Sequence, residues 1–235
     1  MDNDERGDIA SMFADFALEL HNERGVEETV ESVVRFALHA VGCDHASLVL
    51  LRKGHLKVAA VTDPLAERAI SMQLSRGDGP CVAGIAGRVS VHVPDTLTDS
   101  RWPDWAAGMV ELGLRSVLSV RVHATGSTTG ALNLVAKRPH AFGPEDEAIA
   151  HILARHAAVA VATAQQQASL SIAIDARKVV GQAQGILMER YNLDADHAFA
   201  VLRRYSQQNN LKLNDVARRL IATRELPESR TRAHT

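Results

Sequence analysis

The sequence predicts an α+β protein in which an antiparallel sheet, flanked by helices, is followed by a long helix and a C-terminal three-helix bundle. Three observations lead to this fold class. Short β-branched and leucine-rich runs, separated by turn residues, occupy residues 45–136. An alanine-rich stretch without helix breakers begins at Pro144, and apolar residues recur at helical spacing beyond residue 177. We expect about five strands, with helices at the ends of the sheet and on one of its faces.

Two helices are expected before the sheet. The first spans Asp8 to Leu20, where apolar residues lie at helical spacing with acidic residues between them. The second runs from about Val26 to Val41, and Gly42 provides its stop signal.

The strands of the sheet are expected in four stretches. The first stretch, from Ser47 to Thr62, contains two strands in a hairpin around Lys53 and Gly54. The other three strands are expected at Val89–Val93, Ser116–Val122 and Gly130–Ala136. Residues 123–129 have the composition of a turn.

The helix that begins at Pro144 has a well-marked N-terminus, because proline and three acidic residues form its first turn. Its heptad seam is apolar at first and then increasingly polar: Ile149, Ile152, His156, Val159, Thr163, Gln166 and Leu170. Two interpretations are open. The helix packs on its own domain and continues as a signalling or dimerising stalk, or it only covers one face of the sheet.

The last region is helical throughout by its apolar spacing. One apolar stripe runs from Val179 to Tyr191, Asp194 is expected to cap a second helix, and Asn214 a third. We therefore place one domain at residues 1–164, with its last helix from about residue 144 continuing as a linker. A second domain follows at residues 165–227, and a frayed tail at residues 228–235.

The composition excludes several classes of protein. The chain has 235 residues, of which 46% are hydrophobic, and a formal net charge of −2, which excludes disordered, collagen-like and disulfide-scaffold proteins. No window approaches 18 consecutive apolar residues, and the acidic N-terminus lacks the basic start of a secretory signal. We expect a cytoplasmic protein without membrane contact, in which Cys43 and Cys81 are reduced thiols.

The small net charge hides a separation of charge along the chain. Residues 1–169 contain 15 Lys and Arg against 21 Asp and Glu, a net of −6, whereas residues 170–235 contain 11 against 7, a net of +4. A basic segment behind an acidic body is typical of a polyanion-binding module, and it also fits ordinary surface charge.

Sequence motifs of catalysis are missing. The chain contains no nucleophile elbow, Walker loop, dinucleotide fingerprint or zinc-protease motif. Its 11 histidines are scattered without metal-ligand spacing. We therefore expect neither an enzyme nor a metal site, and we predict no cofactor.

Two features are compatible with a small-molecule pocket. Cys81 lies in the glycine-rich loop from Gly77 to Gly84, either as a redox or modification site or, as we favour, as a small buried side chain. Trp102 and Trp105 lie close together beside Arg101. They line a ligand pocket or, in the interpretation that we favour, close the end of the sheet by packing.

Residues 177–221 closely resemble the ANTAR domain, a three-helix RNA-binding module of bacterial transcription antiterminators. The matching positions are AQGILMER at Ala183–Arg190, the Ala-Phe and Leu-Arg pairs of the second helix, Ser206, and LNDVA at the start of the third helix. In such proteins the residue between this alanine and glycine is often lysine. Here it is Gln184, which removes one charge from the expected RNA face.

The resemblance and the basic residues of this region together predict the RNA-binding residues. Arginine, amide and aromatic side chains are the groups that RNA recognition uses, although a solvated bundle that caps an oligomer would look similar. The candidates are Lys178, Ala183, Gln184, Gly185, Arg190, Arg203, Arg204, Tyr205, Lys212 and Arg218.

Residues from about Ile9 to Ala164 resemble a GAF domain of the kind that is paired with ANTAR in actinobacterial proteins. The matching motifs are GDGPC at Gly77–Cys81, VPD at Val93–Asp95, RWPDW at Arg101–Trp105, GLRSVLSV at Gly113–Val120 and GALNLVAKRPHAF at Gly130–Phe142. GAF domains are α/β sensors, and some of them bind cyclic nucleotides, haem or other small molecules. The resemblance therefore implies a sensor of a small molecule or of another signal.

The two resemblances imply a regulator that senses a signal and binds a pair of stem-loops in a nascent leader transcript. Binding would favour an antiterminator over a terminator hairpin. In a homodimer formed through the first helix and the Pro144 helix, each bundle would hold one stem-loop. The alternative is a ligand sensor that dimerises and acts through protein partners without binding RNA.

Overall fold

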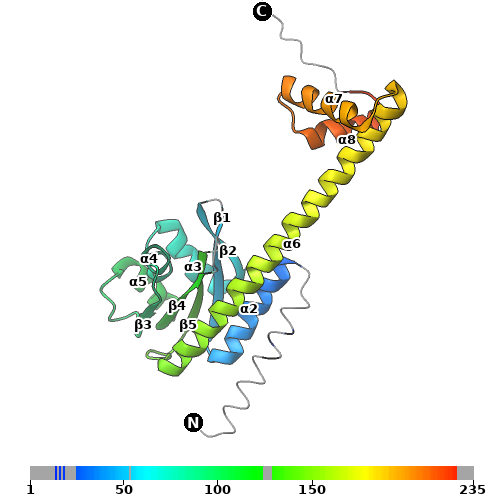
Figure 1. The fold of residues 1–235 in the computed structure, drawn as a ribbon. Coiled ribbons are helices and arrows are strands. Elements are labelled where there is room, and N and C mark those ends of the chain that lie inside the picture. Colours follow the sequence, from blue (N-terminus) through cyan, green and yellow to red (C-terminus); the bar gives the residue numbers. More distant parts are fainter. Residues whose placement is uncertain are drawn as a thin grey trace, which may run out of the picture. The chain divides into compact units, whose positions relative to one another are not determined.

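A computed structural model of the chain describes residues 25–52, 54–123 and 129–226, together with residues 14, 16 and 18 (Figure 1). The predicted turn at 123–129, Pro227 and the predicted tail at 228–235 lie largely or wholly outside the described residues, as does most of the predicted helix from Asp8 to Leu20. Phe16 is described, and its ring stacks on Phe36 with centroids 4.0 Å apart. The chain divides into two compact units, residues 1–166 and 167–235.

The N-terminal unit contains one sheet and the helices that cover it. Its elements are α2 (Val26–Val41), β1 (His45–Arg52), β2 (His55–Val61), α3 (Pro64–Arg76), α4 (Pro80–Gly87), β3 (Val91–Val93), α5 (Pro103–Glu111), β4 (Ser116–His123), β5 (Thr129–Ala136) and the first part of α6 (Pro144–Tyr191). The strand order is β2-β1-β5-β4-β3, and every pair is antiparallel. The predicted α+β class is confirmed.

The predicted strands are present, with one shorter than expected. The predicted hairpin is formed by β1 and β2, and Gly54 between them has the positive φ of 82° that such a turn requires, whereas Lys53 lies outside the described residues. β3 covers only Val91–Val93, because the backbone N–H of Val89 donates to the carbonyl of Gly84 and closes the end of α4 instead.

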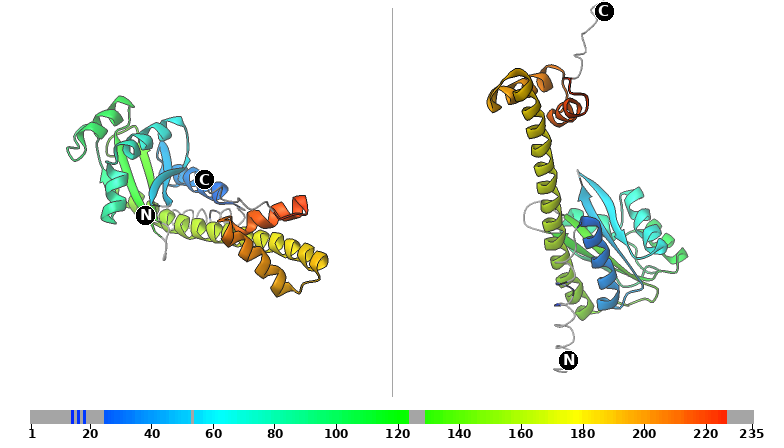
Figure 2. Two further views of the ribbon diagram at one scale, coloured as in Figure 1. Left: turned by 90° about the horizontal axis from the view of Figure 1, so that it is seen from above. Right: turned by 90° about the vertical axis from the view of Figure 1, so that its right-hand side faces the viewer.

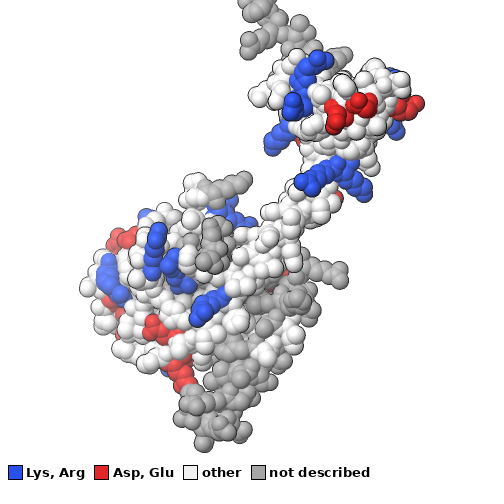
Figure 3. Space-filling view, viewed as in Figure 1, with Lys and Arg blue, Asp and Glu red and all other residues white. Residues whose placement is uncertain are grey.

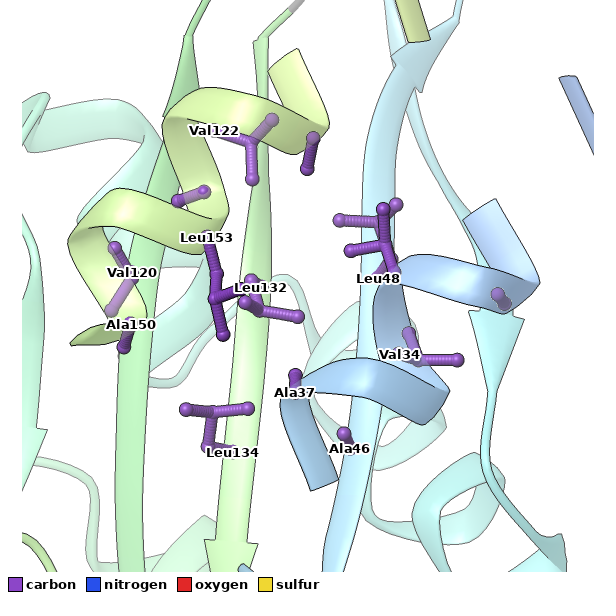
Figure 4. Packing of buried hydrophobic residues seen from close by; sticks show 14 of the residues in the cluster. Val34, Ala37, Ala46, Leu48, Val120, Val122, Leu132, Leu134, Ala150 and Leu153 are labelled. Carbon is purple, nitrogen blue, oxygen red and sulfur yellow. The ribbon is translucent and has the colours of Figure 1, made fainter. Parts of the chain in front are cut away.

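One face of the sheet packs against α2 and α6 (Figures 1 and 2). Helix α2 contributes Val34 and Ala37, and α6 contributes Ala150 and Leu153, to a core shared with apolar side chains of four strands (Figure 4). The strand residues of this core are Ala46, Leu48, Leu50, Ala60, Leu118, Val120, Val122, Leu132, Leu134 and Ala136.

The opposite face of the sheet is covered by α3, α4 and α5 (Figure 2). Our expectation of helices on one face is therefore wrong. Strand β4 shows why helices are needed on both faces. It is buried continuously from Ser116 to Val120, so both of its faces must be covered. The sequence prediction lacks these three helices because all of them begin at prolines, which signal turns as well as helix starts, and because α4 and α5 are also short.

Helix α6 separates its small apolar residues from its predicted heptad seam. The face toward the sheet consists mainly of alanines, with Leu153 and Val161 among them. In the seam, Ile149 is partly buried, whereas Ile152 and Val159 are exposed by 42% and 65%. The helix thus covers the sheet with one face, leaves its seam outward and continues to Tyr191, so it does more than cover the sheet. Its role as a signalling or dimerising stalk stays a prediction.

The C-terminal unit is a bundle of the last part of α6, α7 (Ala195–Gln208) and α8 (Leu213–Thr223). Asp194 caps α7 as predicted, since its carboxylate accepts the backbone N–H of His197 at 2.8 Å. Asn214 does not cap α8, which begins at Leu213 after Lys212, without a side-chain cap. The bundle core consists of Ala183, Leu187, Ala198, Leu202, Val216, Ala217 and Leu220. Among all described residues, no helix combines the length and apolar character that a membrane span requires.

Candidate functional site

Besides Arg190, five of the predicted RNA-binding residues are exposed basic side chains of the C-terminal unit. They lie on all three helices or at their ends: Lys178, Arg203, Arg204, Lys212 and Arg218. Within the described part of the chain, none of the five is paired with a carboxylate. On the face that Figure 3 shows, basic side chains cover more of this unit than acidic ones do. These charges are free to meet phosphates.

Arg190 is exposed, and its side chain also makes a hydrogen bond within the bundle. Its Nη1 donates to the backbone carbonyl of Arg224, the residue that ends α8 in the left-handed region at φ 61°. This contact joins the last turn of α6 to the end of α8. The Arg190 guanidinium also lies 6.0 Å from the ring of Tyr191.

The three motif residues in the centre of α6 have three different environments. Ala183 is fully buried in the bundle core, so it packs the helices and does not reach the surface. Gln184 donates its side-chain N–H to the carbonyl of Ala195 at 3.0 Å and thereby holds the first turn of α7. Gly185 is exposed, and a Cβ at this position would meet nothing within 4 Å.

The aromatic side chains are arranged differently from our expectation. Tyr205 packs against the bundle core, and its hydroxyl is buried without a hydrogen-bond partner among the described residues. Tyr191 is exposed by 57% and Phe199 by 36%, so these two rings are the accessible ones. The sequence did not predict the exposure of these two rings, because both lie at apolar helical spacing, which is typical of core positions. Only the place of Tyr191 at the end of its apolar stripe indicated that its ring could be exposed.

A groove of ≈ 630 Å³ lies between α6 and α8. It brings together two predicted residues, Gly185 and Arg190, with residues that the sequence did not single out. The additional lining residues are Gln182, Ile186, Glu189, Ile221 and Arg224.

In the N-terminal unit, three buried polar side chains form a row across the centre of the sheet. Strand register places Ser47 and Ser119 on either side of Asn133, and all three are nearly inaccessible. The hydroxyl of Ser119 donates to Oδ1 of Asn133 at 2.7 Å. The row lies on the face that α3–α5 cover. Its signal in the sequence is a polar residue at an inward position of each of three otherwise apolar strands.

Cys81 lies on this row in the first turn of α4. Its backbone N–H donates to Oε1 of Gln73 at 2.8 Å, and this contact requires Gly79, because a Cβ there would lie 2.7 Å from the same oxygen. Burial raises the pKa of the Cys81 thiol to about 12, against the smaller opposing effect of Asn133 and Ser119. Cys81 is thus a buried, protonated thiol, as favoured, and Cys43 is also free and buried.

The three predicted pocket residues do not form one pocket wall. Trp102 and Trp105 contact each other edge to face, with centroids 6.1 Å apart, and belong to the core beneath α5. Cys81 belongs to a separate apolar cluster with Val49 and Ile70. The tryptophans therefore pack the end of the sheet.

Three buried polar atoms on this side of the unit have no hydrogen-bond partner among the described residues. They are Nε2 of His45, Nε1 of Trp105 and Nε of Arg121. Strand alternation places His45 and Arg121 on the same face as the polar row. Buried polar atoms without partners are uncommon. The strand register places His45 opposite Val135 and Arg121 opposite Ala131, four residues apart along β5, so the two side chains do not form one site. Across the described ranges, no group of three or more His, Cys, Asp and Glu is placed to hold a metal ion.

Comparisons with solved structures find the same fold in proteins of several kinds. A GAF domain of a phosphoenolpyruvate-protein phosphotransferase from Coxiella burnetii has a TM-score of 0.53 and 19% identity, covering 68% of this chain and 96% of that one. A photosensory core module of a Stigmatella aurantiaca phytochrome has a TM-score of 0.60 and 12% identity, covering 88% and 46%. Free methionine-R-sulfoxide reductase from Neisseria meningitidis has a TM-score of 0.54 and 15% identity, covering 71% and 95%. At these identities the likeness shows the fold alone.

Family models match both units of the chain. A comparison with curated proteins found no match. The ANTAR domain model matches residues 168–221, and the GAF domain model matches residues 25–161, more than half of the chain. GAF domains are sensor domains, and ANTAR domains are RNA-binding modules of antitermination regulators. The chain therefore belongs to the GAF domain family, and it carries an ANTAR domain behind its GAF domain.

Proposed function

We propose that this protein is an RNA-binding transcription antitermination regulator whose GAF domain senses a small molecule or another signal. Its ANTAR domain binds stem-loops of a nascent leader transcript and favours an antiterminator over a terminator hairpin. No covalent chemistry is involved, because differential affinity for two RNA folds is sufficient to shift their populations.

The observation that carries the proposal is the group of exposed, unpaired basic side chains on the ANTAR domain. Lys178, Arg203, Arg204, Lys212 and Arg218 carry no carboxylate partner among the described residues. Phosphate contacts by such side chains provide most of the affinity of a nucleic-acid-binding surface and fix its orientation.

Helix α6 supports the proposal of a homodimer. It leaves Ile152 and Val159 exposed in the GAF domain, and Leu170, Ile172 and Ile174 exposed where the ANTAR domain begins. Exposed apolar side chains along one helix favour burial against a second copy. A dimer would hold two stem-loops at once, and the tether between its sites would strengthen the second contact.

The buried polar row supports a sensing role for the face beneath α3–α5. Strand β5 offers a route from this face to α6. Asn133 points to the polar row, whereas its neighbours Leu132 and Leu134 pack in the core that α6 shares. A ligand that moves Asn133 would therefore displace side chains against α6.

The test is binding of an RNA hairpin recovered by crosslinking to the protein in its cell of origin. We expect affinity above that for a scrambled RNA, falling steeply with salt. Replacing both Arg203 and Arg204 with alanine should weaken binding and reduce the salt slope by about 1 to 2, with unchanged helical content by circular dichroism.

A matched control removes two exposed basic side chains from the GAF domain instead, Arg68→Ala with Arg76→Ala, and should retain the affinity. If the wild-type protein shows neither a salt slope nor a preference for the hairpin, RNA binding is refuted. The alternative, a sensor that dimerises and acts through protein partners, would then hold.

A further inference from the structure

The groove between α6 and α8 has mixed walls. Its volume of ≈ 630 Å³ falls within the range of about 300–1,000 Å³ that is common for small-molecule sites. Ile186 from α6 and Ile221 from α8 provide apolar surface. Gln182 and Glu189 provide an amide and a carboxylate, and neither side chain has a partner among the described residues.

Arg190 and Arg224 make the surroundings of the Glu189 carboxylate basic. Both line the groove, and the hydrogen bond from Arg190 to the carbonyl of Arg224 links its two helices at that end. The exposed carboxylate of Glu189 inside the groove repels a phosphate, whereas the guanidinium groups attract one. The groove therefore suits an uncharged group that is attached to phosphates.

Gly185 gives such a group access to the helix backbone. It lies in the interior of α6, where glycine is less favourable than alanine, and nothing in the bundle occupies the space of its missing side chain. Packing within the chain explains neither Gly185 nor Gly181, which is equally free of neighbours. Gly185 differs from Gly181 in that it lines the groove, where its missing side chain lets a flat group approach the helix closely.

Building on the proposed RNA binding, we propose that this groove receives one unstacked nucleobase of an RNA loop and selects a base that carries an exocyclic amino group. The faces of the base lie against Ile186 and Ile221. Its N–H donors meet the carboxylate of Glu189, which accepts from the amino group of cytosine, adenine or guanine. The phosphates on either side of the base meet Arg190 and Arg224.

The experiment uses the full chain and a hairpin RNA recovered by crosslinking to the wild-type protein. Each loop position of this RNA is replaced in turn by an abasic nucleotide. At one position we expect binding to weaken by about 5- to 100-fold, the effect of losing one stacked base. Gly185→Leu fills the groove, so it should weaken binding of the intact RNA similarly and abolish the sensitivity to that abasic position.

Gly181→Leu is the matched control. Gly181 lies on the same helix, is exposed, has nothing within 4 Å of the place that a Cβ would occupy, and does not line the groove. This variant should bind RNA as the wild type does. Equal binding by the Gly185→Leu and Gly181→Leu variants, or unchanged abasic sensitivity in Gly185→Leu, would overturn the proposal.

Glu189→Gln decides the outcome if Gly185→Leu fails to fold. The glutamine keeps the shape of the side chain but loses one acceptor and the charge. Overall affinity should stay equal or rise, whereas the preference for an amino-bearing base over uracil at the sensitive position should fall about tenfold. An unchanged preference would refute the assignment. If the wild-type chain yields no RNA at all, the proposed function itself fails.

Discussion

Asp63 connects three elements of the GAF domain through one carboxylate. It accepts hydrogen bonds from Nδ1 of His45 at 2.7 Å and from the hydroxyl of Thr62 at 2.8 Å. It also caps α3 by accepting the backbone N–H groups of Leu65 and Ala66. Burial alone would raise its pKa, but these hydrogen bonds outweigh burial and lower the pKa from 3.8 to about 2.

Replacing Asp63 with asparagine should destabilise the GAF domain by about 1–2 kcal/mol at neutral pH, since the cap and its charge are weakened. A carboxylate whose pKa is lowered by folding stabilises the protein above its unfolded pKa. This contribution is lost as the pH falls from about 4 to about 2. Urea unfolding followed by tryptophan fluorescence is suited to the measurement, because both tryptophans belong to this domain. A difference between variant and wild type that persists undiminished at pH 2 would contradict this account, and Glu111→Gln, an exposed change, provides the control.

The two cysteines should resist alkylation in the native protein. Thiolates are the reactive species, and burial raises the pKa of both Cys43 and Cys81 to about 12. Mass spectrometry after iodoacetamide treatment at pH 8 should find both thiols unmodified without denaturant and both modified in urea. Rapid native modification of Cys81 would instead favour the redox interpretation that the sequence left open.

At the scale of elements, periodicity predicted those that bury one stripe of large apolar residues. Helix α2 is of this kind, and its predicted position is confirmed. The predicted strand β1 is also present, but it is buried on both faces from His45 to Leu50, so its β-branched and leucine-rich run and not a single stripe predicted it. Helix α4 has no such stripe, because PCVAGIAG is small and apolar all round. The buried face of α6 consists mainly of alanines, whereas several of its large apolar residues lie in the exposed seam. A pattern of large apolar residues therefore indicated the seam and not the buried face.

The exposed seam of α6 can be separated experimentally from its buried face. Ile152→Glu with Val159→Glu should convert the proposed dimer to a monomer in size-exclusion chromatography with light scattering. The melting temperature of the GAF domain should change little, because both side chains are exposed. Leu153→Ala, on the buried face, should cost about 2–5 kcal/mol of stability. A double variant that stays dimeric would place the interface elsewhere.

At the scale of the whole molecule, the sequence predicted the charged part of the candidate site better than its shape. Exposed arginines and lysines are recognisable from composition, because burial of unpaired charge is unfavourable. The core position of Ala183, the groove beside Gly185 and the contribution of Arg224 depend on how three helices pack. A single sequence carries helix periodicity, but it does not show which faces of separate helices meet.

The separation of charge between the two domains leads to the last prediction. Residues 1–169 carry a net charge of −6 and residues 170–235 one of +4. If the ANTAR domain binds RNA as proposed, an acidic body repels RNA that this domain does not hold specifically. Glu31→Gln, Glu67→Gln and Glu111→Gln are exposed changes in the GAF domain, and together they should raise affinity for scrambled RNA by about two- to fivefold at low salt.

Affinity for the specific hairpin should rise by no more than the same factor, so the discrimination between the two RNAs should not improve. Above about 0.3 M salt the difference between variant and wild type should vanish, because the charges are then screened. Fluorescence anisotropy across a salt series measures both effects. An unchanged affinity for scrambled RNA at low salt would show that the acidic domain does not contribute to specificity, and that the basic side chains of the ANTAR domain act by themselves.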